Sequence, residues 1–298
     1  MDKVGLIGLG NMGLNMAKTL LRHGHVVIGY DNRLEQADDL ATLGGVATLS
    51  AGEVAERAET VILSLPDSPA TEQAVLGPRG VLEGVRAGSL IIDMGSSHPK
   101  STKMLAARLA EKGARMIDAP VSGGPRAAEA GTLAIIIGGA QEDIERAMPI
   151  FRLLGAAEKI TVVGPLGAGH TLKAINNYIY ACSLWVSSEA FVVAAKAGLD
   201  PRLVQRVLAT SSGKNRAVED NIPHHVLDRS FPPSFALRLL NKDLNTFFAL
   251  AEEMNVPTPM AALLKEIYEI AMREVGGDCG DSKIITLLEK WAGVEVRG

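Results

Sequence analysis

The sequence has few of the residues that build disulfide frameworks, metal clusters or nucleic-acid surfaces. Its 298 residues include only two cysteines, Cys182 and Cys279, so no disulfide framework and no cysteine metal clip is expected. The six histidines do not fall at metal-ligand spacings, and the prediction is therefore no metal site. The net charge is −4 and there is no run of Lys and Arg, which argues against nucleic acid as a partner.

Long apolar runs are also missing. Charges or glycines break the apolar segments before they reach the length of a membrane span, so no membrane segment is expected. A first strand beginning by Lys3 leaves no room for a signal or transit peptide. With so few cysteines, these features predict a protein of the reducing cytoplasm. The content of hydrophobic residues, 47%, is enough for two domains with their own cores.

The first part of the sequence alternates between strand and helix patterns. An apolar run at residues 4–7 ends in a glycine-rich turn, an amphipathic segment covers residues 14–22, and a second apolar run ends at Asp31. This order, strand, turn, helix, strand and acid, is one βαβ unit. Further strand-like runs follow as far as Val163, which predicts an α/β domain with a mainly parallel sheet.

Beyond Gly164 the pattern is helical. A long apolar helix is expected to end near Gly198, and Asp200-Pro201 and Thr258-Pro259 are typical of helix starts, with a capping residue followed by proline. We therefore expect an α/β Rossmann dinucleotide-binding domain at residues 1–163. An all-α C-terminal domain for substrate and oligomerisation would follow at residues 164–298, joined to the first by a long interdomain helix.

The glycine-rich turn reads Gly8-Leu9-Gly10-Asn11-Met12-Gly13. Gly8 permits the tight turn, Gly10 lets the backbone approach a pyrophosphate at the helix N-terminus, and Gly13 allows close packing of helix on strand. A glycine pattern alone is a weak indication, but here it leaves a strand and opens a helix. The context therefore predicts a dinucleotide site over a generic glycine-rich turn.

The acid after the second strand bears on the choice of cofactor. Asp31 can accept hydrogen bonds from the ribose hydroxyls and would repel a 2′-phosphate, which favours NAD. Asn32 and Arg33 follow directly, and an arginine at this place can accommodate NADP, so NADP stays possible.

Two further segments contain residues suited to substrate binding or proton transfer. In Asp118-Ala119-Pro120-Val121-Ser122-Gly123-Gly124, small residues expose backbone N–H groups and one hydroxyl, which suits a carboxylate, although alone this could be an ordinary loop. The stretch Gly167-Ala168-Gly169-His170-Thr171-Leu172-Lys173-Ala174-Ile175-Asn176-Asn177 puts Lys173 and Asn177 on one helix face. Such a lysine is either a solvated residue at the rim of the helix or a proton donor in a cleft.

Together these segments resemble the β-hydroxyacid dehydrogenase family, which includes 3-hydroxyisobutyrate dehydrogenase, tartronate semialdehyde reductase and the glyoxylate/succinic semialdehyde reductases. The resemblance covers essentially the whole chain. It rests on four motifs in order, namely residues 8–13, residues 118–124, Gly167-x-Gly169-x-x-x-Lys173-x-x-x-Asn177, and Phe235 with Lys242-Asp243-Leu244. Four ordered motifs are far more specific than any one of them.

The resemblance implies a role for each matching residue. Lys173 would be the catalytic acid/base and Asn177 its substrate-orienting partner. Ser122, Gly123 and Gly124 would hold the substrate carboxylate, and Phe235 would wall the cleft. The cofactor would be lined by Gly8, Leu9, Gly10, Asn11, Met12, Gly13, Asp31, Asn32, Arg33, Leu65, Pro66, Ser96 and Lys242. The resemblance also implies a homodimer or homotetramer formed through the helical domain.

One segment departs from the family. Members often have a Ser-Gly-x-Ser-Trp type sequence where this chain has Ser211-Ser212-Gly213-Lys214-Asn215-Arg216. Lys214 and Arg216 are either solvated surface cations or contacts to a second anionic group of the substrate, and Arg238 raises the same question. Arg216 is taken as a candidate substrate contact.

The expected function is reversible hydride transfer between NAD and a short 3-hydroxy acid or its semialdehyde, a small anionic substrate. One alternative is an NADPH-dependent reductase of glyoxylate or succinic semialdehyde. A second is a catalytically inactive module that binds dinucleotide, against which the Lys173–Asn177 pair argues. Physically, a lysine near a carbonyl that accepts hydride can stabilise the developing alkoxide and donate a proton.

Overall fold

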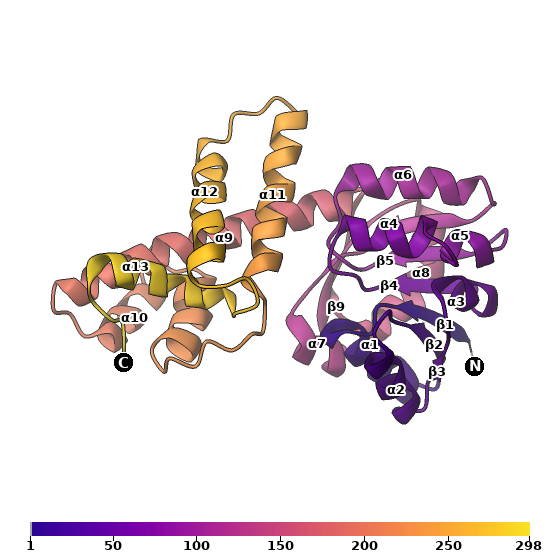
Figure 1. The fold of residues 1–298 in the computed structure, drawn as a ribbon, viewed down its shortest axis with the longest axis horizontal. Helices are drawn as coiled ribbons and strands as arrows, with labels where there is room; N and C mark the ends of the chain where they lie inside the picture. Colours follow the sequence, from indigo (N-terminus) through magenta and orange to yellow (C-terminus); the bar gives the residue numbers. More distant parts are fainter. Residues whose placement is uncertain (1) are drawn as a thin grey trace. The chain divides into compact units, whose positions relative to one another are not determined.

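The computed structural model describes residues 2–298, and the chain divides into two compact units (Figure 1). Unit 1 extends to Lys173 and unit 2 begins at Ala174. Unit 1 is an α/β fold and unit 2 is built from helices, which confirms the predicted fold class. The long helix α9 (Ala168–Lys196) begins in unit 1 and continues through unit 2.

Unit 1 contains a nine-stranded sheet in the order β3-β2-β1-β4-β5-β6-β8-β7, with β9 paired to β8. Its strands are β1 (Lys3–Ile7), β2 (Val26–Tyr30), β3 (Val46–Ala47), β4 (Thr60–Leu63), β5 (Leu90–Asp93), β6 (Arg115–Asp118), β7 (Val121–Ser122), β8 (Leu133–Gly138) and β9 (Gly155–Gly164). Strands β1 to β6 are parallel, and β8 is antiparallel to β6 and β7. The order 3-2-1-4-5-6 reverses direction between β1 and β4, where ligands of such sheets bind beyond the carboxyl ends of the strands.

Helices cover both faces of this sheet. They are α1 (Asn11–Arg22), α2 (Leu34–Thr42), α3 (Ala51–Arg57), α4 (Ser68–Leu76), α5 (Val81–Gly84), α6 (Pro99–Ala110), α7 (Gly124–Ala130) and α8 (Gln141–Leu154). One buried apolar cluster joins α1, α7 and α8 to the sheet, and a second joins α3, α4, α5 and α6 to it. Successive residues of β4 and β5 belong to different clusters, because side chains alternate across a strand.

Local sequence fixes where several of these helices begin. The side chains of Ser50 and Asp67 accept the backbone N–H of Glu53 and Ala70, so they cap α3 and α4. Helix α6 begins at Pro99, and the ring of the preceding residue, His98, accepts the N–H of Lys100.

Unit 2 packs its helices around α9. They are α10 (Pro201–Ala209), a π-helix η1 (Ala217–Val226), α11 (Leu237–Glu253), α12 (Pro259–Glu274), a 3-10 helix η2 (Asp281–Ile284) and α13 (Ile285–Ala292). Asp200 caps α10 through the N–H of Arg202. Thr258 precedes Pro259 at the start of α12 as expected, although its side chain makes no capping hydrogen bond.

The apolar run in α9 is longer than expected from the sequence. This helix is long and apolar enough to cross a membrane by length and composition. The interruptions seen in the sequence do not lower its hydropathy enough, because Lys173 and Glu189 lie 16 positions apart. A core helix of a soluble protein passes the same test, and Leu184, Trp185 and Phe191 of α9 are buried in two clusters of unit 2. The absence of a membrane segment stays a prediction.

Candidate functional site

The glycine turn between β1 and α1 has two glycines that packing requires and one that it does not. Gly8 has φ +92°, and a Cβ on Gly13 would lie 1.9 Å from the carbonyl oxygen of Gly8. A Cβ on Gly10, in contrast, would meet only the Arg33 guanidinium, at 3.5 Å. Protein packing therefore explains Gly8 and Gly13, whereas it does not require glycine at position 10. The turn fits the cofactor that the sequence predicts.

Asp31 holds this turn. Its buried carboxylate accepts the N–H of Leu9 at 2.8 Å and the N–H of Arg33 at 2.9 Å, and it pairs with the Arg33 guanidinium at 3.1 Å. Burial by itself would raise the pKa of Asp31, but the hydrogen bonds from Arg33 and Leu9 outweigh it and lower the pKa. The carboxylate is therefore charged and already bonded within the protein, while the Arg33 side chain beside it is 60% exposed.

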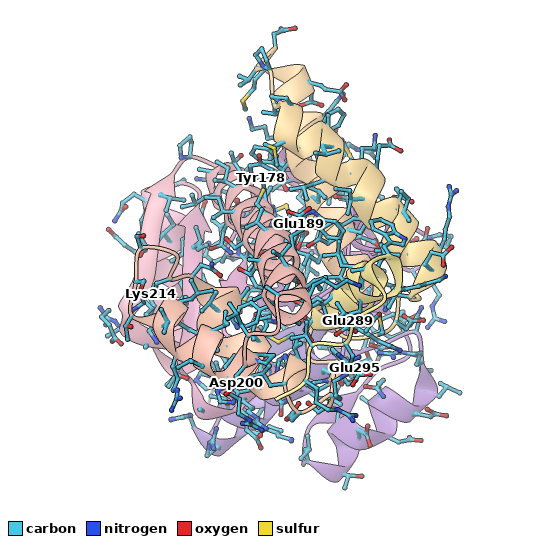
Figure 2. All side chains as sticks on the ribbon, turned by 90° about the vertical axis from the view of Figure 1, so that its left-hand side faces the viewer. Tyr178, Glu189, Asp200, Lys214, Glu289 and Glu295 are labelled. Carbon is cyan, nitrogen blue, oxygen red and sulfur yellow. The ribbon has the colours of Figure 1, made fainter. Side chains whose placement is uncertain are left out.

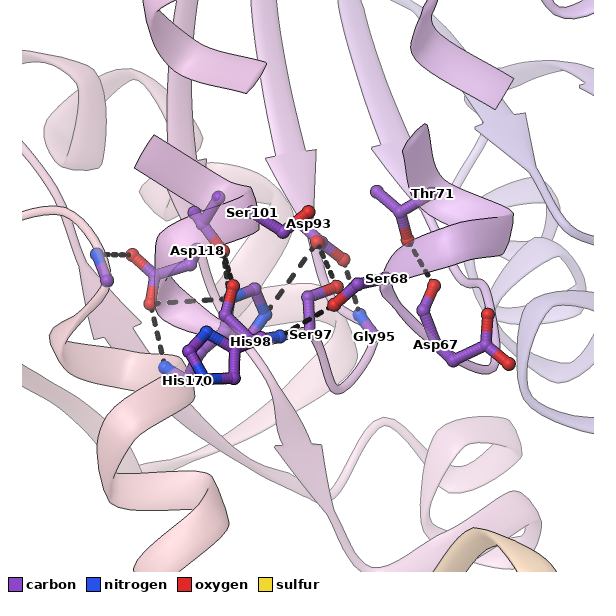
Figure 3. Close-up of polar contacts among 12 residues, drawn as sticks. Asp67, Ser68, Thr71, Asp93, Gly95, Ser97, His98, Ser101, Asp118 and His170 are labelled. Carbon is purple, nitrogen blue, oxygen red and sulfur yellow. Dashed lines mark hydrogen bonds and ion pairs between the residues drawn. The ribbon is translucent and has the colours of Figure 1, made fainter. Parts of the chain in front are cut away.

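The loops after β4 and β5 lie against each other. Leu65 and Pro66 follow β4, and a Cβ on Gly95 after β5 would lie 2.7 Å from the Leu65 carbonyl oxygen. Asp93, the last residue of β5, accepts the Gly95 N–H at 2.9 Å and the Ser97 hydroxyl at 2.8 Å (Figure 3). The predicted cofactor residue Ser96 lies between these two donors. Its loop is therefore fixed by a fully buried carboxylate.

The start of α9 is hydrogen-bonded to the end of β6. Asp118 accepts the N–H of Gly167 at 2.7 Å and that of His170 at 2.8 Å. A Cβ on Gly169 would lie 2.5 Å from the carbonyl oxygen of Ile136 in β8. The two glycines of this motif thus serve helix placement, since Gly167 also has φ +92°. Burial raises the pKa of the Asp118 carboxyl, against the opposing effect of His170 and of the two N–H donors.

Lys173 lies one turn further along α9 and reaches the predicted carboxylate loop. Its Nζ donates a 2.8 Å hydrogen bond to the backbone carbonyl of Val121, the residue before Ser122. Gly123 and Gly124 follow with φ of +130° and +73°, a backbone conformation that side chains disfavour. Unit 1 thus brings Lys173 to the Ser122–Gly123–Gly124 loop, within the same α/β fold as the glycine turn.

In unit 2 the predicted residues Asn177 and Lys242 meet through a third residue. The Asn177 amide donates to Asp243 at 2.5 Å, and Lys242 Nζ lies 2.7 Å from the other oxygen of that carboxylate. Asn177 also accepts a hydrogen bond from Asn176. Phe235 is half-buried against an apolar cluster of unit 2. Asp243 belongs to the quoted Lys242-Asp243-Leu244 motif, but the sequence alone assigned it no role.

The cations of the departing segment have different surroundings. Lys214, labelled in Figure 2, is exposed and pairs with Glu219 at 3.0 Å. Arg216 pairs with Asp220 at 3.3 Å and also stacks its guanidinium 5.6 Å from the ring centre of Tyr180. Tyr180 lies at the spacing that puts it on the α9 face of Lys173 and Asn177. Arg238 pairs with the exposed Asp278.

Sequence reasoning passed over Asp93, His170 and Tyr180. The spacing of four and then three residues from Lys173 through Asn177 could have indicated Tyr180. For Asp93 the available signal was an acid at the end of an apolar strand, the same signal that identified Asp31. Among residues 2–298 there is no group of His, Cys, Asp and Glu that could hold a metal ion.

The chain matches two family models that together cover most of its length. Residues 3–164 match the NAD-binding domain of 6-phosphogluconate dehydrogenase. Residues 167–288 match the NAD-binding domain of NADP-dependent 3-hydroxyisobutyrate dehydrogenase.

Individual relatives are similar over their whole length. The chain is 36% identical to 2-(hydroxymethyl)glutarate dehydrogenase of Eubacterium barkeri over 99% of this chain and 98% of that protein. It is also 36% identical to 2-hydroxy-3-oxopropionate reductase of Escherichia coli, over 97% and 98%. The solved structure of Mycobacterium tuberculosis 3-hydroxyisobutyrate dehydrogenase with L-serine has a TM-score of 0.87 at 31% identity, covering 97% of this chain and 99% of that one. The chain therefore belongs to the β-hydroxyacid dehydrogenase family of NAD(P)-dependent oxidoreductases.

Proposed function

We propose that this protein transfers a hydride reversibly between NAD(P) and a short 3-hydroxy acid or its semialdehyde, with Lys173 as general acid and base. The observation that supports this most directly is the hydrogen bond from Lys173 to the carbonyl of Val121. It holds the ammonium group beside Ser122, the first residue of the loop proposed to bind the substrate carboxylate. The names of the two relatives, a hydroxymethyl acid dehydrogenase and a hydroxy-oxo acid reductase, describe compounds of this kind.

Reversible reduction of a carbonyl requires a group that carries the hydride and a group that carries the proton. NAD(P) supplies or accepts the hydride when it is bound. In the direction of reduction, the Lys173 ammonium stabilises the negative charge that develops on the substrate oxygen and donates a proton to it. In the direction of oxidation, the neutral amine of Lys173 removes the hydroxyl proton. Asn177, four residues further along α9, orients the substrate.

The substrate is proposed to be a small anion. The Ser122 hydroxyl and the backbone N–H groups of Gly123 and Gly124 bind its carboxylate, because these glycines tolerate positive φ values and have no side chains to block the backbone. Phe235 provides an apolar wall.

A second candidate, a substrate with two anionic groups, is favoured by Arg216. Its guanidinium is held over Tyr180 and is 62% exposed, so it can bind an anion bidentately. The relative named 2-(hydroxymethyl)glutarate dehydrogenase acts on a dicarboxylate by its name.

The cofactor is proposed to lie along the carboxyl edge of the sheet in residues 1–163, with residues 164–298 as the substrate and oligomerisation domain. Its proposed contacts are the glycine turn, Asp31, Asn32, Arg33, Leu65, Pro66, Ser96 and Lys242. We propose a preference for NAD, because a charged Asp31 disfavours a 2′-phosphate. Arg33 weakens that preference by pairing with Asp31.

A cofactor-by-substrate panel separates the candidates. The purified protein is assayed with NAD(H) and NADP(H) against 3-hydroxy acids, glyoxylate, succinic semialdehyde and a dicarboxylate semialdehyde. Turnover of 3-hydroxy acids with NAD supports the proposal. Exclusive use of NADPH with glyoxylate or succinic semialdehyde supports the reductase alternative, and dinucleotide binding without turnover supports an inactive module.

The role of Lys173 is tested with a matched lysine from the same helix. Lys196, at the other end of α9, also donates to a backbone carbonyl at 2.8 Å, that of Ala292. Lys173→Ala is expected to lower kcat about a hundredfold or more, with NADH affinity nearly unchanged, as for loss of a general acid. Lys196→Ala is expected to leave kcat within about twofold, because it removes only a surface contact. Near-full turnover of Lys173→Ala contradicts the proposed mechanism.

We further propose a cytoplasmic homodimer or homotetramer formed through the helical unit. Exposed apolar residues of α9 recur at Ile179, Val186 and Val193, every seven positions on one helix face. A second copy of the chain would cover this stripe. Light scattering of wild-type protein and of Val186→Glu tests it, with dissociation expected for the variant.

A further inference from the structure

The ends of β5 and β6 carry a buried polar cluster that the proposed mechanism does not use (Figure 3). Asp93 and Asp118 are paired in the strand register, and the His170 ring lies 3.8 Å from a carboxylate oxygen of each. Nε2 faces Asp93 and Nδ1 faces Asp118, and all three side chains have no exposed area. Buried carboxylates are costly unless hydrogen bonds or cations compensate them. An imidazole held between two of them therefore has an electrostatic role as well as a packing role.

The two ring nitrogens have different surroundings. Nδ1 is 2.8 Å from the hydroxyl oxygen of Thr102, with which it shares a hydrogen bond. Nε2 has no hydrogen-bond partner among residues 2–298 and faces the Asp93 carboxylate. A ring N–H on either nitrogen directs the positive end of its dipole toward a buried carboxylate.

Each partner of the ring belongs to a different segment of the site. Asp93 fixes the loop that contains Ser96, through Gly95 and Ser97. Thr102 belongs to the first turns of α6, and its hydroxyl also lies 3.3 Å from the carbonyl of His98.

The backbone of His170 itself is bound as well. Its N–H is held by Asp118, and Lys173 follows three residues later on the same helix. One imidazole thus touches the ends of two strands and the start of two helices.

We propose that His170 is a positioning residue that fixes the first turn of α9, and with it the Lys173 ammonium, relative to the loop that carries Ser96. Without the ring, Asp93 loses the imidazole that faces it, and the helix start keeps its backbone bonds to Asp118 and the hydrogen bond of Lys173. The role of Lys173 in this inference rests on the proposed function, whereas the placement of the helix start does not.

The test uses substitutions that separate packing from polarity. His170→Leu keeps a buried side chain of moderate size and removes both nitrogens. His170→Gln keeps an amide that can reach Asp93 or Thr102. Thr102→Val removes only the hydroxyl that faces Nδ1. His225→Leu is the matched control, because His225 is a half-buried histidine of unit 2 whose ring faces Ser282 at 3.4 Å.

The first measurement needs no activity. Amide hydrogen exchange is followed for residues 165–173 and 94–98. His170→Leu is expected to raise exchange in both segments about tenfold or more, because local opening depends on local contacts. His170→Gln is expected to restore much of the protection, Thr102→Val to lose a smaller part of it, and His225→Leu to leave both segments unchanged. Unchanged protection in His170→Leu overturns the proposal, whether or not the protein has the proposed activity.

The second measurement asks whether His170 acts through Lys173. His170→Leu is expected to lower kcat about ten- to a hundredfold, the range for a displaced catalytic group, with the KM of the substrate and the Kd of NADH within about twofold. His170→Gln should recover most of this loss.

The double variant completes the test. His170→Leu/Lys173→Ala should be no slower than Lys173→Ala alone, because a positioning residue has nothing left to position. If the kcat losses of the two single variants multiply in the double variant, the proposal is overturned. If wild-type protein shows no hydride transfer with any substrate, the proposed function fails, while the exchange measurement still decides the placement of the helix start. If His170→Leu does not fold, Thr102→Val and His170→Gln provide the same comparison.

Discussion

Buried carboxylates shape the two units in different ways. In unit 1 Asp31, Asp93 and Asp118 lie at the carboxyl ends of parallel strands. Each accepts a backbone N–H group from a loop or a helix start, including those of Leu9 and Gly167. Because these donors are main-chain atoms, the carboxylates set the path of the chain around the proposed cofactor and substrate loops.

In unit 2 two buried carboxylates, Asp243 and Asp281, bind side chains of α9. Asp243 accepts the Asn177 amide and pairs with Lys242. Asp281 accepts the Tyr180 hydroxyl at 2.6 Å, together with the N–H of its own neighbour in the chain. These two carboxylates orient side chains of α9.

The difference predicts where substitutions will act. A lost backbone contact in unit 1 moves a whole loop, so catalysis with every substrate should suffer. A lost side-chain contact in unit 2 releases one group on α9, so the choice of substrate should change more than the chemistry.

Asp118→Ala is expected to have the largest effect. It leaves the buried N–H groups of Gly167 and His170 without an acceptor, at a cost of about 1 to 3 kcal/mol each. The expected kcat loss is about a hundredfold or more for monoanionic and dianionic substrates alike, since displacement of the helix start moves Lys173. Urea unfolding and steady-state kinetics with both substrate types measure the two effects. Asp118→Asn retains one acceptor oxygen and should lose less stability and less kcat. A kcat loss confined to one substrate type would contradict the proposed difference between the two units.

Asp31→Ala tests the carboxylate that holds the glycine turn. It removes a proposed acceptor for the ribose hydroxyls and a charge that disfavours a 2′-phosphate. The ratio of kcat/KM for NAD to that for NADP should fall about tenfold or more. Arg33→Ala is the counterpart and should raise the ratio, because it removes the cation that neutralises Asp31. An unchanged ratio in both variants would mean that other groups set the preference.

Much of unit 1 could be predicted because its signals are local in sequence. The glycine turn, the helix after it and the acid at position 31 each follow from residues a few positions apart. Lys173 and Asn177 were found the same way, from helix spacing and from the resemblance of their motif to a family. The length of the apolar run in α9 was underestimated, since hydropathy over a long helix averages out single charges.

The buried cluster around His170 could not be predicted from local spacing. Asp118 meets Gly167 across 49 positions and His170 across 52, and Thr102 meets His170 across 68. These contacts depend on the register that pairs Asp93 with Asp118 and on the packing of α9 against β8. A single sequence contains no signal for such a register.

Arg216→Ala tests unit 2 directly. If Arg216 binds a second anion from its place over Tyr180, the variant should raise KM about tenfold for dianionic substrates, as for loss of a bidentate contact. Monoanionic substrates such as 3-hydroxyisobutyrate should change less than about twofold, the size of a surface effect. Lys214→Ala is the matched control, since Lys214 makes an exposed pair with Glu219, and it should change neither. Equal losses for both substrates would contradict the selective role.

The smallest effect is expected for Asp281→Asn, measured as stability against pH. Burial raises the pKa of the Asp281 carboxyl above its ordinary value of 3.8, although Tyr180 and the Ser282 N–H act in the opposite direction. The folded protein therefore holds this proton to higher pH than the unfolded chain does. As a result, the free energy of unfolding falls as pH rises from about 3.8 through the raised folded pKa, and the loss is complete above it.

Asparagine cannot titrate but still offers Tyr180 an acceptor oxygen. Asp281→Asn should therefore lose less stability across that window, by about 1 kcal/mol or less, the usual size for a conservative change. The raised pKa of Asp118 acts in the same direction in both proteins and cancels in their difference.

Urea unfolding of both proteins between pH 4 and 8, a range chosen to span roughly the acid limb of stability, measures this difference. Parallel stability curves would show that Asp281 titrates alike in the folded and unfolded states. A fall in kcat with monoanionic substrates would show that a side-chain contact of unit 2 controls the chemistry after all.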